Sequence, residues 1–145
     1  VTGVQTCALP ISDDLNGAGG DILERVRAFF EKKTTEAEQH GVNKNRLCFD
    51  PGIGFGKTNE ENFALIANPE KIRVPGTALL MAASRKRVIG AVCGNPPFED
   101  RMAGTVAAHT ASVLFGADMV RAHDTFEAVQ AARVADAIKQ FRKGV

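Results

Sequence analysis

The chain has 145 residues, of which 44% are hydrophobic and 24% are charged, which suits one hydrophobic core of ordinary size and no second one. Its 18 Lys and Arg are interspersed with 17 Asp and Glu, for a formal net charge of +1, so it lacks the basic field that holds a nucleic acid. No apolar run approaches the ~20 residues of a membrane helix, and we expect neither nucleic acid nor membrane as a partner.

The first twelve residues, VTGVQTCALPIS, follow neither a strand period nor a helix period. They also lack the positive charges that begin a secretory signal. Residues 1–11 look like the in-frame translation of a sequencing adapter, so we expect the natural protein to begin near Ser12 and the earlier half of its gene to be missing from this sequence. A disordered natural N-terminus is the alternative. Residues 13–20 are turn-forming and are predicted to be a flexible junction.

From residue 21 onward, predicted helices alternate with short apolar strands. Asp21 and Glu24 have the spacing of a capping box, and a helix is predicted from there to Gly41. Three strands are expected at 46–49, 78–82 and 118–122. Further helices are expected at 60–67, about 85–94, and 101–116, the last with Ala103, Val106, Ala107, Thr110, Val113 and Leu114 on one side.

The final predicted helix starts after Asp124, which we expect to be its N-cap. Its inward-facing residues are predicted to be Ala131, Val134, Ala135, Ile138 and Phe141. The two cysteines after residue 12, Cys48 and Cys93, lie too far from other potential ligands to suggest a metal site. We expect both to be buried and reduced, as in a cytoplasmic protein.

Apolar strands that alternate with helices indicate βαβ units and a parallel sheet. The sheet could be open and doubly wound, or part of a (β/α)8 barrel. Three strands cannot close a barrel, whose usual length is about 250 residues. The short chain and its unusual opening favour an α/β fold that is about the C-terminal half of a TIM barrel, with three parallel strands and their helices over residues 21–145.

Polar residues follow each predicted strand: DPGIGFGK at 50–57, Ser84-Arg85-Lys86, and Arg121 to Asp124. Because the carboxyl ends of parallel strands lie at one edge of a sheet, we expect these side chains around one cavity. That cavity would be cationic overall. It would suit a ligand that carries phosphate groups and a ring able to pair with a carboxylate.

The glycine-rich segment fails two tests for nucleotide binding. A P-loop needs glycine where Pro51 stands, and a dinucleotide fingerprint that starts at Gly52 needs glycine where Lys57 stands. The glycines still permit a flat ligand to approach the backbone beside Phe55, although an ordinary tight turn explains them equally well.

Each charged candidate also has a structural alternative. Asp50 could cap a turn, Lys86 could be a solvated residue at a helix start, and His123 could be an ordinary loop histidine. His40 and His109 are expected to be structural.

Three segments together carry a family resemblance: FDPGIGFGKTNEENFALI, ASRKRVIG and RMAGTVAAHTASVLFGADMVRAHD. In this order they resemble the C-terminal half of dihydropteroate synthase, over residues 21–143. The resemblance implies a TIM-barrel transferase of folate biosynthesis. Its reaction condenses 6-hydroxymethyl-7,8-dihydropterin pyrophosphate with p-aminobenzoate and releases pyrophosphate.

The resemblance also implies roles for individual residues. Asp50 would pair with the 2-amino and ring N–H groups of the pterin, and Lys86 would donate to its carbonyl and ring nitrogen. Arg121 and His123 would hold the pyrophosphate and, with Lys86, are the expected catalytic residues. Gly54 and Phe55 would border the aminobenzoate, and the segment from Ser84 to Arg87 would lie near its carboxylate. Arg87 stands where some members of the family have a serine at that carboxylate.

Magnesium is the cofactor that the resemblance implies, with its ligand in the missing N-terminal half and none in this chain. The complete protein is expected to be a cytoplasmic homodimer, and this chain to be inactive alone. The alternatives are a non-catalytic pterin-binding fragment and a pterin-dependent methyltransferase, which needs no pyrophosphate site.

Overall fold

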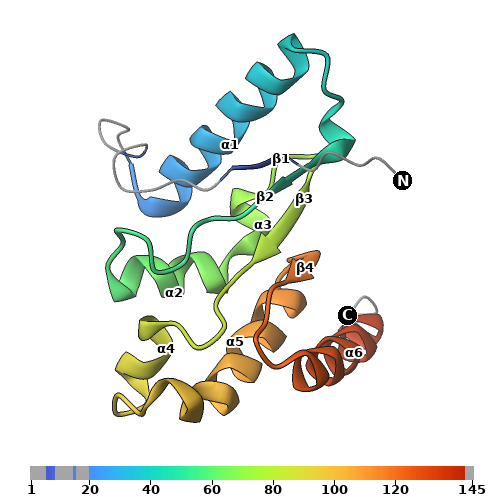
Figure 1. The fold of residues 1–145 in the computed structure, drawn as a ribbon. Helices are drawn as coiled ribbons and strands as arrows, with labels where there is room; N and C mark the ends of the chain where they lie inside the picture. Colours follow the sequence, from blue (N-terminus) through green and yellow to red (C-terminus); the bar gives the residue numbers. More distant parts are fainter. Residues whose placement is uncertain (1–5, 9–14, 16–19, 143–145) are drawn as a thin grey trace.

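The structure is a computed structural model that describes residues 6–8, 15 and 20–142. Four parallel strands form one sheet in the order β1-β2-β3-β4 (Figure 1). They are β1 (Thr6–Ala8), β2 (Leu47–Phe49), β3 (Ala78–Met81) and β4 (Met119–Val120). The helices are α1 (Ile22–Gln39), α2 (Asn59–Ala67), α3 (Pro69–Ile72), α4 (Arg87–Val92), α5 (Met102–Leu114) and α6 (Thr125–Arg142), with 3-10 turns η2 (Lys44–Arg46) and η3 (Phe98–Arg101).

Local sequence signals account for α1. The Asp21 carboxylate accepts hydrogen bonds from the N–H groups of Leu23 and Glu24, at 2.9 and 3.0 Å, and the Glu24 side chain completes the predicted capping box. The helix ends before Gly41, whose φ of 79° is costly for other residues. Phe30, fully buried on α1, stacks on Phe49 of β2 with 4.6 Å between the ring centres. This contact fixes the helix against the sheet.

The three predicted strands are present, and β1 is a fourth that was not predicted. It pairs with β2 in the register Cys7↔Cys48. Strand pairing uses backbone groups that every sequence supplies, so it needs no periodic side-chain pattern. Leu15 is also buried in the core, at 3% exposure, although residues 13–20 were predicted to be a flexible junction. Residues 1–5, 9–14 and 16–19 lie outside the described part, and the adapter origin of residues 1–11 stays a prediction.

The buried face of α5 differs from the predicted one. Ala103 and Ala107 are exposed, whereas the buried residues are Thr105, Ala108, His109, Ser112 and Val113. Thr105 and Ser112 can lie on this face because they donate to the carbonyls of Arg101 and Ala108, each at 2.8 Å. Small residues also allow close approach: a Cβ on Gly104 would lie 2.5 Å from Ile89.

The prediction for α6 is correct at Ala131 and Ala135, which are buried, and wrong for three residues. Val134 is 57% exposed, Ile138 43% and Phe141 83%. The reason is that α6 packs mainly on α5 through its small residues, as the two neighbouring helices in Figure 1 show. The large apolar residues lie on other sides of the helix.

Two further observations complete the fold. Cys48 is buried as predicted, but Cys93 is exposed. Cys93 is the C-cap of the short helix α4 and lies in an exposed segment, residues 91–95. No helix in the described residues is long and apolar enough to cross a membrane.

Candidate functional site

The carboxyl ends of β2, β3 and β4 lead into the three predicted polar segments. Asp50 follows β2 and is 3% exposed, and its Oδ1 accepts a hydrogen bond from the Gly52 N–H at 2.8 Å. Burial raises the pKa of this carboxyl, while the Gly52 bond and the positive charges of Lys86, Arg121 and Lys57 oppose the rise. Asp50 takes part in none of the ion pairs formed by the described residues.

The loop after Asp50 is held in place by the conformation of its glycines and by Lys57. Gly52, Gly54 and Gly56 have φ values of 71°, 82° and 62°, a region that favours glycine. The Lys57 ammonium donates to the carbonyl oxygens of Gly52, at 3.1 Å, and Phe55, at 3.2 Å. Lys57 therefore folds back over the loop, and its burial lowers its pKa to about 8.

Asn62 holds the same loop from α2 and was missed from the sequence. It is 2% exposed. Its Oδ1 accepts from the Gly54 N–H at 2.6 Å, and its Nδ2 donates to the carbonyls of Lys57 and Thr58, at 3.2 and 2.7 Å. The available signal was a polar residue directly before the apolar run Phe63 to Ala67 of α2.

Lys86 connects the loop after β3 with the glycine loop. Its ammonium donates to the Ile53 carbonyl and lies 4.6 Å from the centre of the Phe55 ring, a cation–π distance. A Cβ on Gly54 would lie 3.2 Å from its side chain. Lys86 is the N-cap of α4, at a helix start, but these contacts direct its ammonium to the glycine loop. Burial lowers the pKa of Lys86, and Asp50 opposes this shift.

His123 and Ser84 join the loops after β4 and β3. The Ser84 hydroxyl oxygen accepts from the His123 backbone N–H at 3.1 Å and lies 2.9 Å from Nδ1 of its ring. The ring also contacts Phe98 edge to face, with 5.3 Å between centres. Arg121 begins its loop with a backbone bond to the Met81 carbonyl at 3.1 Å, which places it beside the end of β3.

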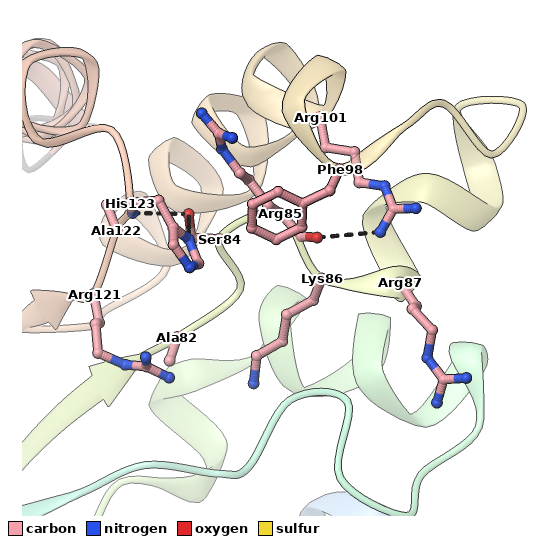
Figure 2. A pocket seen from close by; sticks show the side chains of 10 residues that line it. All are labelled: Ala82, Ser84, Arg85, Lys86, Arg87, Phe98, Arg101, Arg121, Ala122 and His123. Carbon is pink, nitrogen blue, oxygen red and sulfur yellow. Dashed lines mark hydrogen bonds between the residues drawn. The ribbon is translucent and has the colours of Figure 1, made fainter.

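These loops enclose a cavity of about 490 Å³, which we call the cationic pocket. Its lining includes five predicted residues, Ser84, Lys86, Arg87, Arg121 and His123, with Ala82, Arg85, Phe98, Arg101 and Ala122. Figure 2 shows the ends of Lys86 and Arg121 extending to the same side, with Arg87 farther along. Arg87 also lines a second cavity of about 420 Å³, together with Gly54 and Asn62.

Asp50, Gly54 and Phe55 do not line the cationic pocket, but Lys86 links them to it. Phe55 and Gly54 contact the Lys86 side chain, and the charges of Lys86 and Arg121 act on Asp50. Five of the eight predicted residues therefore line the cationic pocket, and Lys86 connects the other three to it. Their roles in binding stay predictions.

Sequence reasoning also missed an ion pair between Arg85, which lines the pocket, and Asp124. Arg85 binds Asp124 through two of its guanidinium nitrogens, and this pairing lowers the pKa of the Asp124 carboxyl. Asp124, expected as the N-cap of α6, thus uses both carboxylate oxygens on Arg85. The residues are 39 positions apart, so no local spacing could have revealed the pair.

Magnesium does not fit the described residues of this site. Mg²⁺ requires oxygen ligands, usually carboxylates, whereas the lining is dominated by Lys and Arg, and Asp50 is bonded to Gly52. The described residues also contain no group of three His, Cys, Asp or Glu that could hold a metal ion. We derive no chemical step through a metal.

The sequence matches the family described as pterin binding enzyme over residues 4–123. The chain belongs to the pterin binding enzyme family. The match begins inside the segment interpreted as adapter. A relative in this family is the dihydropteroate synthase of Synechocystis, which is 37% identical over 119 residues, or 82% of this chain and 41% of that protein.

Two solved dihydropteroate synthases have the same fold as this pterin binding chain. The Burkholderia cenocepacia enzyme, complexed with 7,8-dihydropteroate, has a TM-score of 0.84 and 32% identity, over 96% of this chain and 54% of that one. The Xanthomonas albilineans enzyme, with 4-aminobenzoic acid, has a TM-score of 0.82 and 34% identity, over 92% and 48%. The chain thus spans about half of each, which confirms the predicted partial (β/α)8 barrel.

Proposed function

We propose that this chain supplies the pterin and pyrophosphate sites of a dihydropteroate synthase, which condenses 6-hydroxymethyl-7,8-dihydropterin pyrophosphate with p-aminobenzoate. The observation that carries the proposal is the arrangement around Lys86: a buried carboxylate on one side and an exposed guanidinium and imidazole on the other. This arrangement matches a ligand with a hydrogen-bond-donating ring at one end and two phosphates at the other. The relatives' names and ligands support the same assignment.

At the pterin end, Asp50 is the anchor. A carboxylate that accepts two parallel N–H donors both orients a ring and binds it strongly, and the 2-amino and ring N–H groups of a pterin are such donors. The Asp50 carboxyl is already oriented by Gly52. The Lys86 ammonium donates to the Ile53 carbonyl in this structure. With the pterin bound, it would turn to the carbonyl and ring nitrogen of the pterin.

At the other end, Arg121 and His123 hold the pyrophosphate. In the reaction, the bond between the methylene carbon and the pyrophosphate oxygen breaks and its electron pair leaves with pyrophosphate. The aniline nitrogen attacks the same carbon and then loses a proton. Arg121, His123 and Lys86 stabilise the negative charge on the leaving group, so that positioning and electrostatics supply the catalysis.

The aminobenzoate would lie between Gly54 and Phe55 on one side and the segment Ser84 to Arg87 on the other. Arg87, at the first turn of α4, offers a guanidinium for its carboxylate in place of the serine of some family members. A guanidinium and a carboxylate pair well in two-point geometry. Ser84, bonded to His123, keeps this segment beside the pyrophosphate site.

Other properties of the complete protein stay predictions: a magnesium requirement, a homodimer, a cytoplasmic location, and inactivity of this chain alone. A pterin-dependent methyltransferase would share Asp50 but has no use for the Arg121 and His123 cluster. The cationic pocket therefore favours the synthase.

Calorimetric titration of the 145-residue chain with the pterin pyrophosphate tests the proposal. We expect binding that Asp50→Asn weakens by about tenfold or more, since one strong two-point hydrogen bond is lost. Asp136→Asn, an exposed carboxylate on α6, is the matched control and should bind like the parent chain. Equal affinity of the Asp50 and Asp136 variants would remove the pterin anchor.

A further inference from the structure

Arg85 occupies a backbone conformation that its residue type disfavours. Its φ of 54° lies in the left-handed region, which glycine or asparagine adopts with less strain than arginine. Among the described residues that are not glycine, Asn95 is the other one with a positive φ. An arginine at a position that suits glycine points to a use for its side chain.

The contacts of Arg85 show that use. Its Nε donates to Oδ2 of Asp124 at 2.9 Å and its Nη2 donates to Oδ1, and the two side chains are 17% and 18% exposed. The guanidinium lies 5.1 Å from the centre of the Phe98 ring. Two-point pairing and stacking on an aromatic ring are both specific to arginine.

The backbone of Arg85 is fixed as well. Its N–H donates to the Thr105 hydroxyl at 2.8 Å, and its carbonyl accepts from Nη1 of Arg101 at 3.2 Å. Figure 2 shows the Arg85 side chain directed away from the ends of Lys86 and Arg121. Arg85 therefore does not point its charge at the place where a ligand would bind between them.

Its neighbours in the sequence are the residues that do face the site. Ser84, directly before it, contacts His123, and Lys86, directly after it, reaches the glycine loop. Asp124 directly follows His123. The Arg85–Asp124 pair thus joins the two loops one residue away from the proposed pyrophosphate ligands.

We propose that Arg85 is a positioning residue whose pairing with Asp124 sets the distance between the Lys86 ammonium and the Arg121 and His123 cluster. The inference rests on the proposed function, because that cluster is there the pyrophosphate site. Arg85 then acts through geometry, and Asp124 is its equal partner although its negative charge repels a pyrophosphate ligand.

Two variants separate this claim from a role of charge alone. Arg85→Gly removes the side chain and relieves the backbone, so it should fold. Asp124→Asn leaves the positive charge of Arg85 unpaired. Positioning predicts that each variant weakens binding of inorganic pyrophosphate to the 145-residue chain, by about tenfold, and that the double variant binds like either single one. A role of charge predicts opposite signs, with tighter binding by Asp124→Asn, and that result overturns the inference.

If the parent chain does not bind pyrophosphate, that result counts against the proposed function and not against the positioning role. A measurement without ligand then tests the positioning role by itself. Backbone ¹⁵N relaxation should show increased motion of the Lys86 and His123 amides in both single variants. Arg27→Gln breaks the exposed Arg27–Glu31 pair of α1 and is the control that should leave them unchanged. Unchanged amides in either Arg85→Gly or Asp124→Asn would also refute the positioning role.

Discussion

The ammonium of Lys86 lies 4.6 Å from the centre of the Phe55 ring, and this contact joins the loops that follow β2 and β3. Burial beside the ring lowers the pKa of Lys86, while the charge of Lys86 limits the rise in the pKa of Asp50. A carboxylate and an ammonium that influence each other in this way form an electrostatic unit.

Lys86→Met should raise the pKa of Asp50 further, because the positive charge of Lys86 that opposes its protonation is lost. The change can be followed by ¹³C NMR of the Asp50 carboxyl during a pH titration. Lys71→Met, an exposed change on α3, should leave the titration of Asp50 as it is. A pKa of Asp50 that does not respond to Lys86→Met would refute the electrostatic unit.

Asp50 should also make stability depend on pH. Its folded-state pKa is raised above the unfolded value of 3.8, so its contribution is fully present below pH 3.8 and is lost as pH rises through the folded pKa. Asp50→Asn should remove this loss and stabilise the chain at neutral pH while it weakens pterin binding. Urea unfolding at pH 7 of parent and variant checks the sign. A less stable variant would contradict it.

Lys57 gives the opposite pH dependence. Its pKa falls from 10.5 to about 8 in the folded chain, so the folded state holds fewer protons than the unfolded state between these values. Stability from this group therefore rises with pH from about 8 to about 10.5. Lys57→Met should flatten the rise in urea midpoints across that range. A slope that is the same with and without Lys57 would show that its ammonium is not desolvated.

Asn62→Ala should destabilise the chain by about 2–3 kcal/mol, because the Gly54 N–H and two carbonyls lose a buried partner. Asn62→Asp keeps an acceptor for Gly54 and loses both donor bonds, so it separates the two contributions. Chemical unfolding measures both. A cost below about 0.5 kcal/mol, the range of ordinary surface changes, would mean that Asn62 does not hold the glycine loop.

These effects depend on contacts that differ in how visible they were in the sequence. The capping box of Asp21 and Glu24 spans one helical turn, so residue type and spacing were enough to predict it. Continuous apolar runs between turn residues are also local patterns. They were enough to predict the strands that precede Asp50, Lys86 and Arg121.

Contacts made at long range were not visible. Arg85 and Asp124 meet because two strand ends lie side by side, and no spacing in the chain encodes that meeting. The faces of α5 and α6 were misassigned at Ala103, Ala107 and Phe141 because hydrophobicity alone cannot tell which side of a helix finds a neighbour. Small and polar residues are the buried ones on α5 and α6, because the close approach of the two helices decides which side is buried.

The most direct test of the central claim is an NMR study of the isotope-labelled 145-residue chain bound to 6-hydroxymethyl-7,8-dihydropterin pyrophosphate. We expect pterin protons to show contacts with the Lys86 side chain and the Asp50 carboxyl signal to shift. The Arg121 and His123 side chains should shift only when the ligand carries its two phosphates. Pterin contacts elsewhere, or equal shifts of Arg121 and His123 with the phosphate-free pterin alcohol, would contradict one ligand spanning the three strand ends.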